Sequence, residues 1–190
     1  MRLMEEKILK DGVVLPGNIL KVGSFLNQQL DVLFLKELAV EFASRFRDAG
    51  ITKVITIEAS GIAIATLTAL ELGVPCVVVK KHASANLSSD VYTAEISSFT
   101  HKNTYTAVVA KEYIKPDDCV LVVDDFLAVG NAIQGIRKML SDAGASLGGC
   151  AIAIEKSFQG GGDALRAEGI RVESLAMVDS MSDTSLTFRT

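Results

Sequence analysis

Two adjacent carboxylates follow a continuous apolar run near the middle of the chain. The run is Cys119-Val120-Leu121-Val122-Val123, and Asp124 and Asp125 come directly after it. A Val-rich run of this kind is typical of a strand that is buried on both faces of a parallel sheet. The carboxyl ends of such strands form the crevice in which open α/β sheets bind ligands. The two acids are therefore the first candidates for chemistry, with solvated acids before a turn as the alternative, because Asp is common in turns.

A short loop and a helix follow the two acids. The loop contains Gly130, and from about Asn131 apolar residues recur at helical spacing at Ile133, Ile136 and Leu140. A helix amino terminus offers unpaired N–H groups and roughly half a positive charge, which suits a phosphate. Carboxylates beside an anion site make sense where the ligand also carries hydroxyls or a bound cation. A ribose phosphate with magnesium has both, so the pattern favours a ligand of this class.

The stretch from Val122 to Ala132 resembles the phosphoribosyl diphosphate (PRPP) motif of type I phosphoribosyltransferases, most closely in their xanthine branch. The general family usually has Thr, a second Gly and a final hydroxyl residue in the loop. This chain departs from that pattern, and its loop residues are Ala128, Val129, Gly130, Asn131 and Ala132. The resemblance implies that the backbone of these five residues binds the phosphate of PRPP, and that Asp124 and Asp125 are catalytic.

A second strand, loop and helix are expected to open towards the same edge of the sheet. Residues Lys53 to Glu58 are mostly β-branched, and Ala59-Ser60-Gly61 then turns into an apolar helix from Ile62 to Leu72. The resemblance implies that Ser60 and Gly61 bind PRPP through its diphosphate. On spacing alone, an ordinary tight turn between a strand and a helix remains open.

The next strand ends in Lys80-Lys81, and residues 82–104 after it are polar. The resemblance implies that Lys80 and Lys81 bind PRPP and that residues 82–104 form the mobile arm that closes over it. We expect a hairpin that turns near His101-Lys102-Asn103 and returns through Tyr105 to Ala110. A solvated basic strand end and a plain surface loop are the alternatives, and no arm residue is assigned a catalytic role.

Base recognition is expected from the first thirty residues and from the loop after the strand Cys150 to Ile154. In the xanthine branch, residues matching Lys156 and Asn27 contact the purine, and Leu20 lies beside it. Xanthine carries oxygens at C2 and C6 and ionises more readily than guanine, so its site needs donors and a cation. Lys156 and the Asn27 amide supply these, unless Lys156 is simply solvated and Asn27 is a turn residue.

The order of elements predicts an α/β fold with a mainly parallel sheet flanked by helices, because strands and helices alternate. Asp31 is expected to cap an amphipathic helix that runs to Arg47, and a last strand, Ile170 to Val178, to finish the sheet. We expect one domain, residues 1–190. About residues 1–30, with those after the last strand, are expected to form a small cap or hood.

Composition restricts the function classes. Lys and Arg number 19 and Asp and Glu 23, so the net charge is 19 minus 23, or −4, which argues against nucleic-acid binding. The three cysteines show no C-x-x-C spacing, so buried free thiols in a reduced compartment are expected. No apolar run reaches the roughly 20 residues of a membrane helix, so we expect a cytoplasmic protein that does not enter membranes.

The resemblance implies transfer of the phosphoribosyl group from PRPP to N9 of xanthine, with release of diphosphate. It also implies a homodimer and a Mg²⁺ ion that is bound through PRPP or diphosphate, with no direct protein ligand. Three rivals remain open. They are a PRPP-sensing regulator of nucleotide genes, a phosphoribosyltransferase for guanine, hypoxanthine or adenine, and a receiver domain, which also places acids at strand ends.

Overall fold

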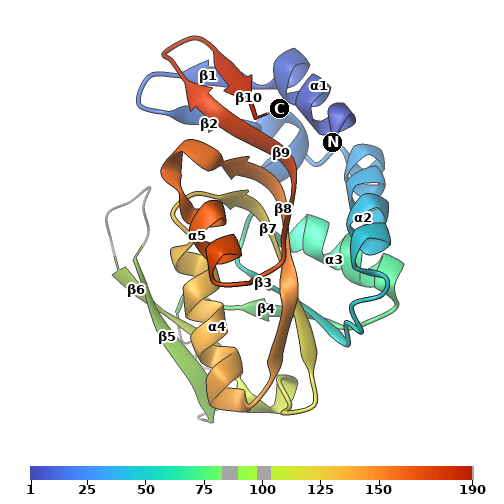
Figure 1. The fold of residues 1–190 in the computed structure, drawn as a ribbon. Helices are drawn as coiled ribbons and strands as arrows, with labels where there is room; N and C mark the ends of the chain where they lie inside the picture. Colours follow the sequence, from blue (N-terminus) through green and yellow to red (C-terminus); the bar gives the residue numbers. More distant parts are fainter. Residues whose placement is uncertain (83–89, 98–103, 190) are drawn as a thin grey trace.

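Six strands form the central sheet of the computed structural model, which describes residues 1–82, 90–97 and 104–189 (Figure 1). The strand order is β10-β9-β8-β7-β3-β4. Each neighbouring pair is parallel except β10 with β9, which is antiparallel. The α/β fold with a mainly parallel sheet is therefore confirmed.

The bounds of the elements follow the apolar pattern of the chain. The strands of the central sheet are β3 (Lys53–Ile57), β4 (Cys76–Val79), β7 (Cys119–Leu127), β8 (Ser146–Lys156), β9 (Val172–Met181) and β10 (Leu186–Phe188). The α-helices are α1 (Arg2–Asp11), α2 (Val32–Phe46), α3 (Ile62–Leu72), α4 (Asn131–Ala143) and α5 (Gly161–Ala167). Two small antiparallel sheets pair β1 (Val13–Leu15) with β2 (Ile19–Lys21), and β5 (Val91–Ser97) with β6 (Thr104–Ala110).

Helices cover both faces of the sheet, as Figure 1 shows, with α2 and α3 on one face and α4 and α5 on the other. Alternate residues of β7 face opposite layers. Leu121 and Val123 belong to the core that contains residues of α2 and α3, and Val120 and Val122 belong to the core that contains residues of α4. A strand with an apolar layer on each side needs no polar alternation, which explains the continuous run that begins at Cys119.

Local signals set several helix ends. The Asp31 carboxylate accepts a hydrogen bond from the Phe34 N–H at 3.2 Å, so the predicted cap of α2 is confirmed. Helix α3 spans the predicted Ile62 to Leu72. Gly144 ends α4 in the left-handed conformation, with a φ of 73°, which glycine adopts without steric cost.

Four boundaries were predicted wrongly. Helix α1 was missed, although Met4 and Ile8, four residues apart, bury one face of it. The sheet does not finish at Val178, because β9 continues to Met181 and pairs with β10. The strands β7 and β8 run on past the predicted ends and stay paired up to Leu127 and Glu155. The errors at β7, β8 and β9 come from stopping a strand at the first polar residue, whereas pairing continues through it.

The expected arm is seen in part. The strands β5 and β6 form an antiparallel hairpin, so the return strand is confirmed. The turn expected near His101-Lys102-Asn103 lies outside the described residues. Backbone hydrogen bonds between Lys80 and Val108 join the start of this segment to β6, and Ile96 packs against Gly135 of α4. The hairpin is therefore anchored against the body of the protein at both strands.

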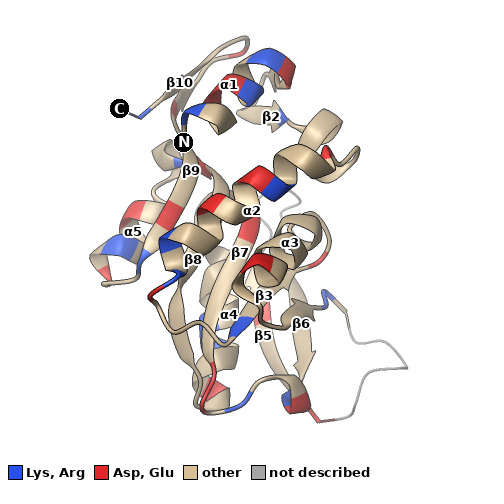
Figure 2. Ribbon diagram, turned by 90° about the vertical axis from the view of Figure 1, so that its right-hand side faces the viewer, with Lys and Arg blue, Asp and Glu red and all other residues tan. Residues whose placement is uncertain are grey.

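Charges of both signs are interspersed along α1 and α2 in Figure 2. No helix in the described part of the chain is long and apolar enough to cross a membrane. The cysteines Cys76, Cys119 and Cys150 are free. Cys150 is buried, and burial raises the pKa of its thiol to about 12, whereas the other two cysteines are only partly buried.

Candidate active site

A pocket lies at the carboxyl ends of β3 and β7, where β7 leads into α4. It gathers most of the residues that the sequence singled out for PRPP. Its lining includes Ser60, Lys81, Asp124, Asp125 and the loop from Ala128 to Ala132, together with Ile57, Glu58, Ile96, Ser97, Tyr105, Phe126, Leu127 and Ile133. Five stretches of the sequence thus meet at one edge of the sheet, where open α/β sheets bind ligands.

Asp125 is the polar centre of this pocket and is only 6% exposed. Its carboxylate accepts hydrogen bonds from the Ser60 hydroxyl at 2.9 Å, the Asn27 side-chain amide at 3.0 Å and the Phe126 N–H at 3.1 Å. An ionised carboxylate only accepts hydrogen bonds, so Asn27 must turn its Nδ2 towards Asp125. The Oδ1 of Asn27 is then directed away from the acid, which fixes the orientation of this amide.

Asp124 lies beside Asp125 and is half-buried. Its Oδ1 accepts the Asp125 N–H at 2.9 Å. Burial, followed by the neighbouring charge of Asp125, raises the pKa of the Asp124 carboxyl well above its ordinary value. A Cβ at Gly61 would lie 2.8 Å from Asp124 Oδ1 and 2.4 Å from Thr56 Oγ1, so the turn after β3 needs glycine to approach the acid.

The two lysines after β4 have different surroundings. Glu58 accepts hydrogen bonds from the Lys81 N–H at 2.7 Å and from Lys80 Nζ at 3.2 Å. These contacts, chiefly that of the Lys81 N–H, lower the pKa of the Glu58 carboxyl. Lys81 lines the pocket, and its Nζ lies 5.5 Å from the centroid of the Tyr105 ring. The structure therefore does not bring Lys80 into the pocket lining with Lys81.

The loop between β7 and α4 presents its backbone to the pocket. Gly130 has a φ of 89°, a left-handed conformation that other residues rarely adopt, and it precedes the first turn of α4. The N-cap residue Gly130 has no side chain that could accept from the N–H groups of the first turn, and such groups at a helix amino terminus suit an anion. Asn131 Nδ2 donates to the Ser97 carbonyl at 2.9 Å and joins the loop to β5.

The three residues expected at the base are not in the lining of the first pocket. Leu20, which is buried, and Asn27 line a second pocket formed by residues of the first thirty. The Lys156 Nζ donates to the Asn18 carbonyl at 2.8 Å and lies 5.5 Å from the centroid of the Phe126 ring. Burial lowers the pKa of the Lys156 ammonium. Asn27 lines the second pocket and donates to Asp125, which lines the first, so it connects the two.

The pocket residues that sequence reasoning did not single out as site residues include Glu58, Tyr105 and Phe126. Glu58 accepts from the Lys80 ammonium and from the Lys81 N–H, yet its position at a strand end gave no sign of these partners. Tyr105 and Phe126 line the pocket and lie near the ammonium groups of Lys81 and Lys156. An aromatic residue directly after a pair of acids was the available signal for Phe126, because aromatic faces attract cations.

Comparisons with known sequences identify a family for this chain. The model of the phosphoribosyl transferase domain matches residues 28–165. Xanthine phosphoribosyltransferase of Limosilactobacillus fermentum is 48% identical over 100% of this chain and 97% of its own. Xanthine phosphoribosyltransferase of Lachnoclostridium phytofermentans is 48% identical over 100% of this chain and 98% of its own.

Solved structures agree at the level of the fold. Adenine phosphoribosyltransferase of Giardia lamblia, complexed with 9-deazaadenine, superposes with a TM-score of 0.78 at 20% identity, covering 93% of this chain and 98% of its own. That of Rhodothermus marinus gives 0.74 at 24% identity, covering 93% and 99%. The match of the family model over most of the chain, and the full-length similarity to curated relatives, show that this chain belongs to the phosphoribosyl transferase family.

Proposed function

We propose that this chain transfers the 5-phosphoribosyl group of PRPP to N9 of xanthine, giving xanthosine 5′-monophosphate (XMP) and diphosphate. The observation that carries the proposal is the full-length similarity, at 48% identity, to relatives named xanthine phosphoribosyltransferase. The shared pocket of Asp124, Asp125, Ser60 and the loop Ala128–Ala132 supports it, because these groups suit a ribose that carries phosphates.

The loop and the acids have separate roles in this proposal. The N–H groups of Ala128 to Ala132 bind the 5-phosphate at the amino terminus of α4. Asp124 and Asp125 hold the ribose hydroxyls and stabilise the positive charge that develops on the ribose ring as the bond to diphosphate breaks. Ser60 and Gly61 bind the diphosphate, with Lys81 facing it. Catalysis is then mostly positioning and electrostatics.

The donor set fits a magnesium ion that is bound mainly through the substrate. Burial, and then the charge of the adjacent Asp125, raise the pKa of Asp124, so the pair of carboxylates favours a nearby cation. Most of the acceptor capacity of Asp125 is already used by Asn27, Ser60 and Phe126, so few protein oxygens remain. Mg²⁺ commonly keeps water and substrate phosphates as ligands. When bound, it would neutralise charge on the leaving diphosphate.

Base selection is proposed to rest on Lys156 and Asn27, with Leu20 beside the base. The Lys156 ammonium is held over Phe126 by the Asn18 carbonyl, so a cation is already in place for an oxygen of xanthine. A guanine site would need an acceptor for the 2-amino group at that position. Discrimination of this kind is strong where a mismatched base leaves buried polar groups unpaired.

Further features of the proposal concern the assembly and the cell. We infer one domain in which about residues 1–30 form a cap over the base site and about residues 82–104 an arm that closes over PRPP. We also infer a cytoplasmic homodimer whose partners are PRPP and xanthine rather than nucleic acid or membrane. Light scattering of the purified protein tests the dimer, since a monomer at micromolar concentration would contradict it.

Turnover with single bases tests the reaction. Wild type and Lys156→Met are each given PRPP, Mg²⁺ and one of xanthine, guanine, hypoxanthine or adenine, and diphosphate release is measured. The proposal expects wild type to be fastest with xanthine and Lys156→Met to lose that preference. Preference for another purine would keep the reaction but refute the base assignment. Binding of PRPP without turnover on any base would favour the PRPP-sensing regulator.

A further inference from the structure

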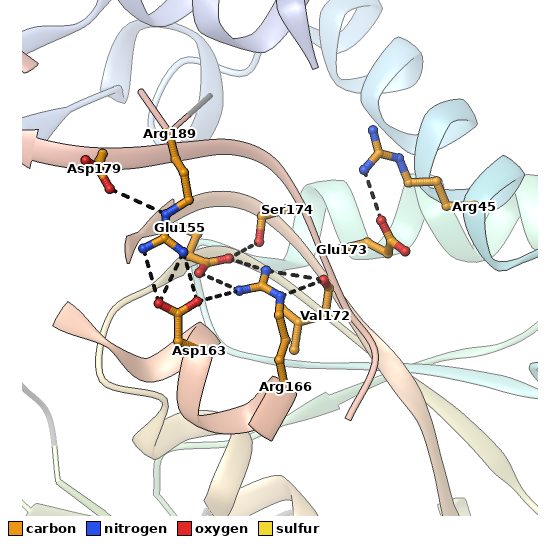
Figure 3. Close-up of polar contacts among 9 residues, drawn as sticks. All are labelled: Arg45, Glu155, Asp163, Arg166, Val172, Glu173, Ser174, Asp179 and Arg189. Atoms are coloured by element: carbon orange, nitrogen blue, oxygen red, sulfur yellow. Dashed lines mark hydrogen bonds and ion pairs between the residues drawn. The ribbon is translucent and has the colours of Figure 1, made fainter. Parts of the chain in front are cut away.

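A buried ion pair lies next to the base site. The side chain of Glu155 is 0% exposed, although it directly precedes Lys156 at the end of β8. Its carboxylate accepts hydrogen bonds from Arg166 Nη1 at 2.9 Å and Nη2 at 2.7 Å, and from the Ser174 hydroxyl at 2.5 Å (Figure 3). A buried charge is tolerated only when paired and hydrogen-bonded, and this two-pronged contact meets that requirement.

The pair fastens α5 to the sheet. Arg166 belongs to α5, and its Nη2 also donates to the Val172 carbonyl of β9 at 3.3 Å. A Cβ at Gly162 would lie 2.0 Å from Glu155 Oε1, so the first turn of α5 rests directly on the carboxylate. The helix therefore has one fixed position relative to β8 and β9 while the pair is intact.

The same helix supports the loop that precedes α4. The Gly161 N–H donates to the Ala128 carbonyl at 3.1 Å. A Cβ at Gly161 would lie 2.3 Å from that carbonyl oxygen and 2.8 Å from the Gly130 nitrogen, so the two backbones are in direct contact. Gly161, at the start of α5, thus contacts the proposed phosphate loop. Arg166 of the same helix pairs with Glu155, the residue before Lys156.

We propose that Arg166 is a positioning residue, whose pairing with Glu155 sets the spacing between the loop Ala128–Ala132 and Lys156. This inference rests on the proposed function, in which these two segments bind the phosphate and the base of one nucleotide. A ligand that spans both segments depends on their spacing, whereas a ligand that occupies one of them does not. Misplacement by about 1 Å costs on the order of a hundredfold in well-oriented reactions.

Other ion pairs around α5 are poor candidates for this role. Asp163 pairs with Arg189 at 2.9 Å, and Arg189 pairs with Asp179 at 3.4 Å, but these carboxylates are about half exposed. Exposed pairs contribute little to stability, because water and salt screen them. Arg166 and Glu155 differ because one of the two charges has no contact with solvent.

The chain offers a matched control. Arg45 is 27% exposed and pairs with Glu173 of β9 at 3.2 Å (Figure 3). Arg166 is 30% exposed and donates to the carbonyl of Val172, the residue before Glu173. Arg45→Met therefore removes an arginine of similar exposure that is paired with the same strand, but does not touch α5 or Glu155. The two variants separate a positioning effect from the general loss of an ion pair.

The experiment compares three ligands by calorimetry: XMP, which spans the site, and ribose 5-phosphate and xanthine, which occupy its parts. For Arg166→Met we expect XMP affinity to fall about tenfold or more while ribose 5-phosphate changes less than about twofold. Arg45→Met should bind all three ligands like wild type. Arg166→Lys, which keeps the charge but loses the planar fork, should recover part of the XMP affinity.

Arg166→Met leaves the buried carboxylate of Glu155 without its charged partner, which can prevent folding. A second variant tests the proposal in that case. Glu155→Gln with Arg166→Met removes both charges, which buried sites tolerate better. Wild-type affinity for XMP in this folded variant, or equal losses for all three ligands, would overturn the positioning role. Failure of wild type to bind XMP or to turn over xanthine would instead overturn the proposed function and, with it, this inference.

Discussion

The substitution Asp124→Asn is expected to stabilise the free protein while it abolishes most of the activity. Asp124 carries a charge that burial and the adjacent Asp125 both disfavour. Asparagine keeps Oδ1, which accepts the Asp125 N–H at 2.9 Å, so the substitution removes the charge without removing the hydrogen bond. The repulsion between the Asp124 and Asp125 carboxylates therefore destabilises the fold, although the proposed chemistry needs both charges.

The size of this effect follows from the repulsion between neighbouring carboxylates. Two unit charges about 4 Å apart interact by about 1 kcal/mol in bulk water and about 4 kcal/mol at an effective dielectric constant of about 20. Asp124 is half-buried and open to a pocket, so its surroundings lie between these limits. We expect Asp124→Asn to raise the free energy of unfolding by roughly 1–3 kcal/mol at neutral pH.

The direction of the pKa shift of Asp124 determines how the stability gain changes with pH. The pKa of Asp124 is raised in the folded protein above its ordinary value of 3.8, so the wild type loses stability as pH rises from 3.8 through the folded pKa. The gain from Asp124→Asn should therefore be small near pH 4 and largest near pH 8. Urea unfolding followed by circular dichroism measures this gain at each pH.

Asp163→Asn is the control, since Arg189 chiefly holds the pKa of the Asp163 carboxyl below its ordinary value. This control should not gain stability at any pH between 4 and 8. A loss of stability in Asp124→Asn at pH 8, or a gain that does not change between pH 4 and pH 8, would refute the reasoning.

Three further predictions concern the walls of the pocket. Gly61→Ala should lower the free energy of unfolding by roughly 1–3 kcal/mol and reduce turnover. The new methyl group would lie 2.4 Å from Thr56 Oγ1 and 2.8 Å from Asp124 Oδ1. Urea unfolding and kcat measure the two effects. Gly130→Ala should cost about 1–2 kcal/mol at a φ of 89° and raise the KM for PRPP, whereas an unchanged KM would contradict the role of the loop. Because burial lowers the pKa of Lys156, the KM for xanthine should rise with pH at values below its ordinary pKa of 10.5; a Lys156→Arg variant should lack this rise.

Local pattern was sufficient for the elements that hold the site. The run of β-branched residues from Lys53 and the apolar helix that ends before Gly73 predicted β3 and α3, and the Asp31 cap placed the start of α2. Apolar runs and turn residues act over a few neighbouring positions, so one sequence can reveal them. The same reasoning placed Asp124 and Asp125 at the edge where ligands bind.

Contacts between distant segments could not be read in the same way. Lys80 and Lys81 are adjacent and chemically alike, yet only Lys81 lines the pocket. The Lys80 ammonium pairs with Glu58, and the Lys80 backbone bonds to Val108 of β6. The pairing of Glu155 with Arg166 depends on the path of the loop between β8 and α5, which leaves no periodic signal. Side-chain partners of this kind are set by tertiary packing rather than by propensity.

Competition between bases tests the central claim most directly. The wild-type protein is given limiting PRPP, Mg²⁺ and equal concentrations of xanthine, guanine and hypoxanthine, and the nucleotides formed are quantified by mass spectrometry. The pocket of Asp124 and Asp125, with Lys156 over Phe126, predicts that XMP is by far the main product. Guanosine or inosine monophosphate as the main product would contradict the account.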